Sequence, residues 1–458
     1  MLALAATVAC GGADRRQFAD ALKQASAKTP RWVARDALGK RLWAIEQKFY
    51  ANRQHLPAWI DGTDPTPQLD ALLEALRDSE RHGLQPAAYG YEELAAARTK
   101  ADETWIGASF EEQVIPELDL RLTYAFLSHA ADLLGWTTSP REIDRNWLPS
   151  PKKADLATHL TAALDGNNVR EALDELAPVH PQYKGLMAAL ARGQGVDAQK
   201  IRMNLERWRW APRDLGERHI LINVPRYEMQ VVENDRPVLA MRVIVGAQDT
   251  PTPLFSDQMT YVVFSPYWNI PESILREETL PRLVDDSEYL SRNNIEVVDT
   301  SGEIVDPSGV DWSDDVTAEG LRFRQAPGPE NALGLVKFIF PNHFSVYLHD
   351  TPTDALFAKE KRTFSHGCIR VEKPVALAEY VLRNKERWSP DRIRAAMTGK
   401  REQSVTLEDP LPVHIGYWTA WVEADGSVTY IDDPYGLDRR QATLDARRQR
   451  IGTAARAD

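Results

Sequence analysis

The first half of the chain places apolar residues at the spacing of an α-helix. One run carries them at Leu69, Leu72, Leu73 and Leu76. These positions share one helix face, and Pro67 and Gly83 stand where a helix start and end are expected. Similar stripes predict helices at about 116–134, 169–176 and 183–191. We therefore predict a helical scaffold domain over residues 29–192.

Residues 193–217 are expected to connect this scaffold to a second domain. Within them, positions 204–210 read Asn-Leu-Glu-Arg-Trp-Arg-Trp. Alternating Arg and Trp side chains could stack on sugars or on nucleic acid. The interpretation we favour is an amphipathic connector whose tryptophans pack on the next domain.

After Pro212 the apolar period changes from 3.6 to 2, which predicts β-strands. Strands are expected at 219–224, 228–232, 238–245, 259–264, 334–340 and 344–348. Short turns and few helices between strands favour an antiparallel sandwich or a barrel-like sheet. The predicted fold class is α+β, in which the helical scaffold precedes a mainly antiparallel β-sandwich domain over 218–440. Residues 441–458 are expected to form a charged C-terminal tail.

An acidic, irregular stretch interrupts the β pattern at about 274–326. It begins with a helical pattern at 271–280. An insertion this long inside a β domain is usually a lid over a binding site. We therefore expect a capping subdomain here.

The first 28 residues resemble the end of an export signal. A short apolar run, 1–9, leads to Cys10-Gly-Gly, as in lipoprotein signals whose cysteine is acylated. We expect this tail to be disordered and, if Cys10 is lipidated, to associate the protein with the inner or outer membrane. No run of about 18 apolar residues follows, so no transmembrane helix is expected.

The charge balance argues against a nucleic-acid partner. The chain has 55 Lys and Arg against 67 Asp and Glu, a net charge of −12. Proteins that bind nucleic acid usually present a basic face. The chain has two cysteines, which is too few for a disulfide framework.

The second cysteine, Cys368, is a candidate nucleophile. It lies in the run 365–371, Ser-His-Gly-Cys-Ile-Arg-Val, and His349 precedes it on a predicted strand. A thiol near its usual pKa of about 8.5 is mostly protonated at neutral pH, so a histidine base is needed to activate it. Strand alternation turns Tyr347 and His349 to the same side. His349 is our preferred base because a strand fixes it, and His366 is the other candidate.

Neighbouring residues complete the expected site. Gly367 lets the main chain approach a substrate closely because it has no Cβ. Backbone N–H groups near Gly367 and Cys368, with the Tyr347 hydroxyl, could form an oxyanion hole. Arg370 could hold a substrate carboxylate or make a structural ion pair, and the residues alone leave both open.

A metal site is the main alternative chemistry. Its ligands would be His343, His349, Asp350, His366 and Cys368. Zinc accepts such groups. However, His343 and His349 stand six residues apart on one hairpin, and no His-Glu-x-x-His pair occurs. We therefore expect neither a metal nor a cofactor.

The motif Ser365–Arg370, with His349 sixteen residues before it, resembles the active site of the L,D-transpeptidases. The resemblance extends to 49–59, 181–190, 204–210, 266–271, 325–335 and 338–342. These segments are similar to the large periplasmic branch of the family, with its N-terminal helical scaffold and catalytic domain of the YkuD type. Together they cover about residues 40–435.

This resemblance implies a periplasmic enzyme of cell-wall biogenesis and cell shape. In the family, the cysteine attacks the diaminopimelate carbonyl of a tetrapeptide stem and expels D-Ala. The acyl group then passes to the amine of another stem's diaminopimelate, giving a 3→3 cross-link. Carried over, Cys368 is the nucleophile and His349 the base. Ser365, His366 and Gly367 shape the site with Tyr347, and Arg370 supports it. The resemblance also implies that carbapenems acylate Cys368, and it makes other cell-wall enzymes candidate partners.

The chain departs from the family in one respect. Large members usually insert a small peptidoglycan-binding module before the segment matching 204–210. Here only nine residues lead from Leu190 to Gln199, which leaves no room for it. Two other outcomes of the same thiol chemistry stay open: water as acceptor, which makes an L,D-carboxypeptidase or endopeptidase, and attachment of an outer-membrane lipoprotein.

Overall fold

The computed structural model describes residues 18–457, except 104–108, 151, 194, 196, 287, 308–311, 313–319 and 384–385, and it describes no side chains beyond residue 448. The chain forms two compact units. One ends at Asp214 and resumes at Trp418, and the other spans Leu215–Tyr417. The second unit is therefore inserted into the first. It ends earlier than the predicted boundary at 440, because the last β-hairpin and helix return to the helical unit.

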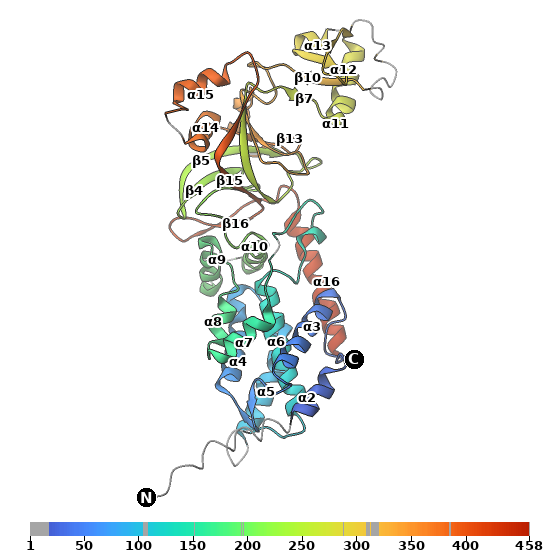
Figure 1. Cartoon of the computed structure of the whole chain (residues 1–458), viewed down its shortest axis with the longest axis vertical. Helices are drawn as coiled ribbons and strands as arrows, with labels where there is room; N and C mark the ends of the chain where they lie inside the picture. The colour runs from blue at the N-terminus through green and yellow to red at the C-terminus, as the bar shows by residue number, and fades with distance from the viewer. Residues whose placement is uncertain are drawn as a thin grey trace, which may run out of the picture. The chain divides into compact units, whose positions relative to one another are not determined.

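The first unit is built mainly of helices (Figure 1). They are α2 (Ala19–Ser26), α3 (Ala37–Asn52), α4 (Pro67–Arg77), α5 (Tyr91–Asp102), α6 (Ile115–Leu133), α7 (Leu156–Asp165), α8 (Val169–Asp174), α9 (Pro181–Arg192), α10 (Ala198–Trp210) and α16 (Leu437–Ala457). Two hairpins accompany them: β1 (Ile60–Asp61) with β2 (Asp64–Pro65), and β16 (Ala420–Val422) with β17 (Val428–Tyr430). The helices predicted from the apolar stripes correspond to α4, α6, α8 and α9. None of the described helices is long and apolar enough to cross a membrane.

Both predicted tails are wrong in part. Residues 18–28, expected to be disordered, contain α2, because Phe18, Leu22 and Ser26 share one buried helix face. The expected C-terminal tail is mostly α16, where Gln441 is fully buried and its amide oxygen accepts from Arg207 Nε at 2.9 Å. Cys10 lies outside the described residues.

The Arg- and Trp-rich run forms the buried end of α10. Arg207, Trp208, Arg209 and Trp210 are each at most 4 % exposed, which leaves no face for sugars or nucleic acid. Trp208 stacks between His180 at 4.1 Å and Trp418 at 4.2 Å between ring centres. The tryptophans do pack, as favoured, but inside their own unit and not on the next domain.

The second unit contains a nine-stranded sheet. Its strands are β3 (Arg218–Asn223), β4 (Glu228–Glu233), β5 (Arg236–Gly246), β6 (Ser256–Phe264), β11 (Val336–Ile339), β12 (Leu348–His349), β13 (Thr363–Ser365), β14 (Ile369–Val371) and β15 (Gln403–Gly416). Their order is β13-β5-β14-β12-β11-β6-β15-β3-β4, and β4 also pairs with β5. This last pairing closes one continuous sheet on itself, so the predicted sandwich is a closed, barrel-like sheet. Its pairings are antiparallel except β12–β14, β15–β3 and β13–β5.

The predicted strand at 344–348 is shorter than expected. Only Leu348 and His349 pair as β12. The Asn342 side chain instead bonds to the backbone that precedes β12. Its oxygen accepts hydrogen bonds from the N–H groups of Phe344 and Val346, and its Nδ2 donates to two carbonyls. Such local bonds compete with strand pairing.

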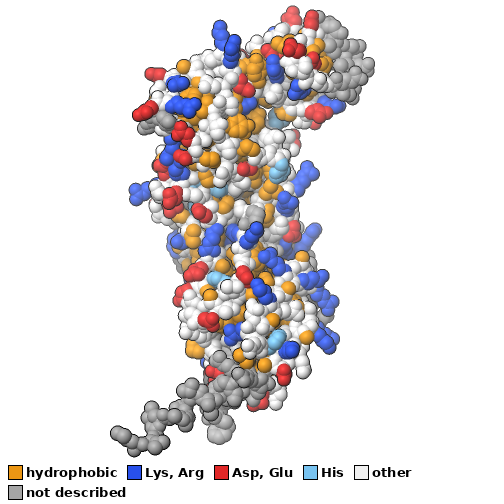
Figure 2. Space-filling view, viewed as in Figure 1, with side chains coloured by type: hydrophobic (Ala, Val, Ile, Leu, Met, Phe, Trp, Pro, Cys, Tyr) orange, Lys and Arg blue, Asp and Glu red, His pale blue; other side chains and the backbone are white. Residues whose placement is uncertain are grey.

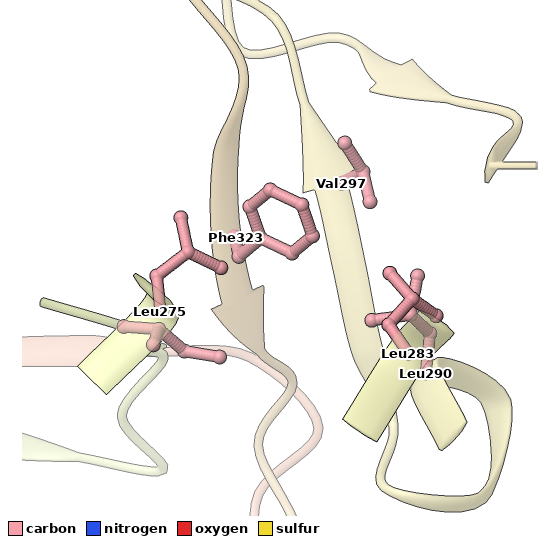
Figure 3. Packing of buried hydrophobic residues seen from close by; sticks show 6 residues of the cluster. Leu275, Leu283, Leu290, Val297 and Phe323 are labelled. Carbon is pink, nitrogen blue, oxygen red and sulfur yellow. The ribbon is translucent and has the colours of Figure 1, made fainter. Parts of the chain in front are cut away.

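The inserted segment folds into a capping subdomain with its own core. It contains β7 (Trp268–Asn269), α11 (Glu272–Ile274), the π-helix η4 (Leu275–Thr279), α12 (Leu280–Asp285), α13 (Tyr289–Arg292), β8 (Ile295–Val298), β9 (Ile304–Val305) and β10 (Arg322–Gln325). The sheet order is β7-β10-β8-β9. Figure 3 shows Phe323 among Leu275, Leu283, Leu290 and Val297, all buried. The subdomain begins at β7, somewhat before the predicted position 274.

Two further helices, α14 (Pro374–Leu382) and α15 (Pro390–Met397), follow β14. The first has Pro374 as its first residue. On the face shown in Figure 2, acidic and basic side chains are interspersed.

Candidate active site

The register between β12 and β14 brings the predicted site residues together. The two strands pair in parallel, with Leu348 opposite Ile369 and His349 opposite Arg370. Before this pair of strands begins, Ile369 N–H donates to the Tyr347 carbonyl at 3.1 Å, so that Cys368 lies beside Tyr347. Leu348 and Ile369 are fully buried in the core. Alternation therefore turns Tyr347, His349, Cys368 and Arg370 to the opposite face.

On that face, Cys368 and His349 are diagonal neighbours. With strands ~4.8 Å apart and a rise of ~3.3 Å per residue, their Cα atoms are about 8 Å apart, a gap that the two side chains can span. No hydrogen bond joins the two side chains in the described part of the chain. The Cys368 thiol instead points to the Ser345 carbonyl, with Sγ 3.9 Å from the oxygen. Proton transfer to His349 therefore requires the sulfur to rotate away from Ser345.

The environment of Cys368 keeps its thiol protonated. The side chain is partly accessible, but protein atoms crowd it on most sides. This burial raises the pKa of the Cys368 thiol to about 11, although a hydrogen bond from Tyr347 and the charge of Arg370 act in the opposite direction. Almost no thiolate therefore exists at neutral pH.

His349 is held as a neutral imidazole. It is 4 % exposed, and burial, with the positive charge of Arg370, lowers its pKa to about 3. Its Nδ1 lies 2.6 Å from the Asp350 carbonyl oxygen, which can only accept a hydrogen bond. In the neutral ring the proton is therefore on Nδ1, and Nε2 keeps a lone pair, as a general base requires.

The loop before Cys368 is fixed by short polar contacts. Gly367 N–H donates to Ser365 Oγ at 3.2 Å, and Thr252 Oγ1 donates to the Gly367 carbonyl at 2.9 Å. Gly367 has φ +111°, a conformation that L side chains rarely adopt. Two backbone donors, Gly367 N–H and Cys368 N–H, were expected to form an oxyanion hole. The N–H of Gly367 already donates to Ser365 and is not available for this role.

Tyr347 lies between the other members of the site. Its ring is 5.8 Å from that of His349, and its hydroxyl interacts with Cys368. Burial, followed by the neighbouring cysteine, raises the pKa of Tyr347 well above its usual value. The hydroxyl therefore stays protonated and can donate to sulfur or to a developing oxyanion.

Arg370 has no ion pair among the described residues. Its Nη1 donates to Thr353 Oγ1 at 3.2 Å, and its buried Nε has no partner. Burial lowers the pKa of Arg370 from its usual value. Of the two roles open from the sequence, the structural ion pair is absent, and a free guanidinium faces the site.

His366 points away from the thiol and toward the cap. Its Nε2 lies 2.7 Å from the Glu278 carboxylate in η4, and both side chains are partly exposed. The loop of the nucleophile and the capping subdomain are thus in direct contact. The ring of His343 packs against that of Phe344, 4.0 Å between ring centres and tilted by 37°. Among the described residues, no three His, Cys, Asp or Glu side chains are placed to hold a metal ion.

The sequence did not predict four contributions to the site, which come from Thr252, Glu278, Thr353 and the carboxylate of Asp350. Asp350 follows His349 directly, and its carboxylate accepts a hydrogen bond from Leu335 N–H at 2.8 Å. This bond fixes the backbone next to His349. A Cβ at Gly334 would lie 2.4 Å from the Asp350 side chain. Only the sequence Ala-Leu-Gly-Leu, with its isolated glycine, hinted at this close approach.

Comparisons with known proteins place this site in a family. Residues 217–410 match the L,D-transpeptidase catalytic domain (YkuD), and residues 46–190 match the Scaffold domain. A Haemophilus influenzae protein named "Putative L,D-transpeptidase" is 30% identical over 407 residues, which are 86% of this chain and 78% of that protein. The chain therefore belongs to the L,D-transpeptidase family of the YkuD type, with an N-terminal scaffold domain.

Two solved structures are also similar. An L,D-transpeptidase from Mycobacterium smegmatis has 14% identity, 43% coverage of this chain and 58% of that chain, with a TM-score of 0.21. The L,D-transpeptidase 1 of Mycobacterium tuberculosis has 14% identity, 43% coverage of this chain and 60% of that chain, with a TM-score of 0.17. The chain thus matches less than two thirds of the length of these solved relatives.

Proposed function

We propose that the protein forms 3→3 cross-links in peptidoglycan through an acyl-enzyme on Cys368. The proposal rests on one observation above all: a protonated thiol and a neutral imidazole share one face of two paired strands, in a chain of this family. The donor is a tetrapeptide stem and the acceptor is the amine of another stem's diaminopimelate. The protein acts in the periplasm, where these stems lie.

The first half-reaction transfers the donor stem to sulfur. The thiol rotates toward His349, whose Nε2 takes its proton as sulfur attacks the diaminopimelate carbonyl. The resulting oxyanion accepts hydrogen bonds from the Tyr347 hydroxyl and the Cys368 backbone N–H. The C–N bond to D-Ala then breaks, and the protonated His349 gives its proton to the leaving amine.

The second half-reaction returns the enzyme. The neutral acceptor amine attacks the thioester, His349 takes one of its protons, and the thiolate leaves and is reprotonated. Arg370, which is free of ion pairs in the described structure, holds a carboxylate of a bound stem. The neutral resting pair makes this a general-base mechanism, since no preformed thiolate is present.

The test is to incubate isolated cell wall with the full chain, digest it and analyse the products by mass. We expect new tetrapeptide–tripeptide dimers with the native chain and none with Cys368→Ala. The same spectra separate the other acceptors: tripeptides without dimers indicate hydrolysis, and muropeptides carrying lipoprotein residues indicate attachment. Dimers formed by Cys368→Ala would refute the role of the thiol.

A further inference from the structure

The helical unit contains a cavity of 270 Å³ for which the site described above has no use. It is lined by Arg41 of α3, by Leu134, Gly135 and Trp136 after α6, by Pro149, Ser150 and Lys152, and by the end of α10. Gly135, with φ +70°, ends α6 against α10: a Cβ there would lie 2.6 Å from the Arg209 carbonyl oxygen. This close approach makes Trp136 and Trp210 two walls of the cavity.

The lining carries positive charge and no carboxylate. The Arg41 guanidinium carbon lies 3.7 Å above the centre of the Trp136 ring, and Arg41 makes no ion pair with any described residue. The Lys152 amine donates to the Arg209 carbonyl, which uses one of its three N–H groups. Burial, followed by the charges of Arg209 and Arg213, lowers the pKa of Lys152 to about 7. The described lining thus gathers basic groups with no carboxylate beside them.

A third donor lies in the lining. Trp210 is 2 % exposed, and its indole Nε1 is buried with no hydrogen-bond partner. Buried polar groups in folded proteins are nearly always paired. Two cations and a buried N–H group without an acceptor therefore surround one space.

We propose that this cavity binds a carboxylate-bearing residue of a peptidoglycan stem peptide, with the carboxylate between Arg41 and Lys152 and the apolar part of the residue against Trp136 and Trp210. The identity of the ligand rests on the proposed function. The volume exceeds the ~30 Å³ that one water occupies in the liquid, so it accepts more than a bare ion. Aromatic walls favour a ligand with an apolar body.

This second site lets the helical unit itself bind the cell wall. Only five residues separate α9 from α10, so no separate wall-binding module lies between them. A stem held by the scaffold raises the local concentration of substrate for the catalytic unit on the same chain. The scaffold would then be a wall-binding domain as well as a support.

The experiment is a site-resolved binding measurement on the full-length Cys368→Ala chain, which cannot turn over. Its lysines are methylated with ¹³C-formaldehyde, and the Lys152 signal is assigned by its loss in Lys152→Arg. The probe is the tripeptide L-Ala-γ-D-Glu-diaminopimelate. We expect it to shift the Lys152 signal saturably and to raise the pKa read from that signal, whereas the fully amidated tripeptide does neither.

The variant Arg41→Gln should weaken this binding about tenfold, the loss of one charge-assisted hydrogen bond. Lys40→Gln, an exposed neighbour on α3, is the matched control and should change nothing. No shift of the Lys152 signal at millimolar tripeptide overturns the proposal. Equal shifts with inorganic phosphate or acetate overturn the assignment to stem peptides.

The two proposals fail in different ways. In the native Cys368 background, Arg41→Gln should leave turnover of a soluble tetrapeptide unchanged while lowering the rate on intact cell wall. A chain that binds the tripeptide at Lys152 but forms no dimers contradicts the proposed function alone. If the native chain and Arg41→Gln form dimers at equal rates on intact wall, only the scaffold site is contradicted.

Discussion

At the residue scale, the site consists of two groups that burial keeps uncharged. The thiol of Cys368 has its pKa raised to about 11, and the imidazole of His349 has its pKa lowered to about 3. A thiolate–imidazolium pair at neutral pH would need a lowered pKa for the thiol and a raised pKa for the imidazole. In the proposed mechanism, a proton therefore moves from sulfur to nitrogen as the carbonyl is attacked.

The two candidate bases should differ strongly on mutation. His349→Ala should lower kcat about 10²–10⁴-fold, the usual range for removing a general base. His366→Ala should lower it about tenfold or less, because His366 contacts Glu278 of the cap and not the thiol. Rates measured side by side on a tetrapeptide donor decide this, and the reverse ranking would make His366 the base.

Alkylation of Cys368 should show an unusual pH profile. Because the folded pKa is about 11, the rate with iodoacetamide should rise about tenfold per pH unit from pH 6 to 10 without levelling off. The measurement uses Cys10→Ser, so that Cys368 alone reacts. A plateau near pH 8 would mean an ordinary thiol. Tyr347→Phe, which removes a hydrogen bond that favours the thiolate, should slow the reaction at every pH.

The chemistry of the site was predictable from the sequence, but its contacts were not. Tyr347 and His349 were expected to share a face, and the register of β12 and β14 adds Cys368 to that face. Thr252 and Glu278 could not be found, because each reaches the site from more than 85 positions away along the chain. The unpaired state of Arg370 depends on which carboxylates fold nearby, and no local pattern encodes that.

At the scale of single elements, the capping subdomain has a small core that Phe323 dominates. Phe323 is 2 % exposed on β10 and packs against helices and strands of the cap. The sequence indicated an insertion but not this core, since the apolar residues that form it lie far apart in an acidic, irregular stretch. The loss of β-strand pairing at 344–347 was likewise hidden, because it depends on the Asn342 side chain folding back on its neighbours.

Phe323→Ala should unfold the cap locally. Truncating a buried phenylalanine costs about 3–5 kcal/mol, a large share of what so small a core can supply. Hydrogen exchange of 272–298 should therefore reach the rate of an open segment, while β6 and β15 keep their protection. Ile304→Ala, at a position 65 % exposed on β9, is the matched control and should leave exchange unchanged. Unchanged protection in Phe323→Ala would show that the cap is not stabilised by this core.

At the scale of the whole molecule, the helical unit contains two buried histidines that should make its stability depend on pH. His82 and His129 are at most 3 % exposed, with ring centres 6.5 Å apart. Burial lowers the pKa of His82, and it lowers that of His129 to about 3. In the unfolded chain both should titrate near 6.5.

The sign follows from these shifts. Below pH 6.5 the unfolded chain binds protons that the folded unit cannot, so the free energy of unfolding should fall as the pH drops from 6.5 toward 3. For His129 the loss at pH 5 is about 2 kcal/mol. Urea unfolding at pH 7 and pH 5 measures it, and His129→Phe should reduce the difference by about that amount. An equal pH dependence in both proteins would contradict the burial of a neutral His129.

The division of the chain could not be predicted from local patterns. The predicted helices and strands lie mostly where expected, yet the last hairpin and α16 join the first unit, more than 200 positions after α10. The polar surface of α16 resembles a solvated tail, but Gln441 and Asp438 bind Arg207, and Arg440 pairs with Asp144.

This inserted arrangement has a consequence for the order in which the protein is made. The ribosome completes residues 215–417 before it releases Trp418, against which Trp208 stacks, and α16, which pairs with Arg207. The catalytic unit can therefore fold while Trp208 and Arg207, at the end of α10, still lack Trp418 and Asp438 as partners. A chain cut short after residue 417 would keep every atom of the thiol site and still expose that surface, which makes it a substrate for proteolysis before it can act.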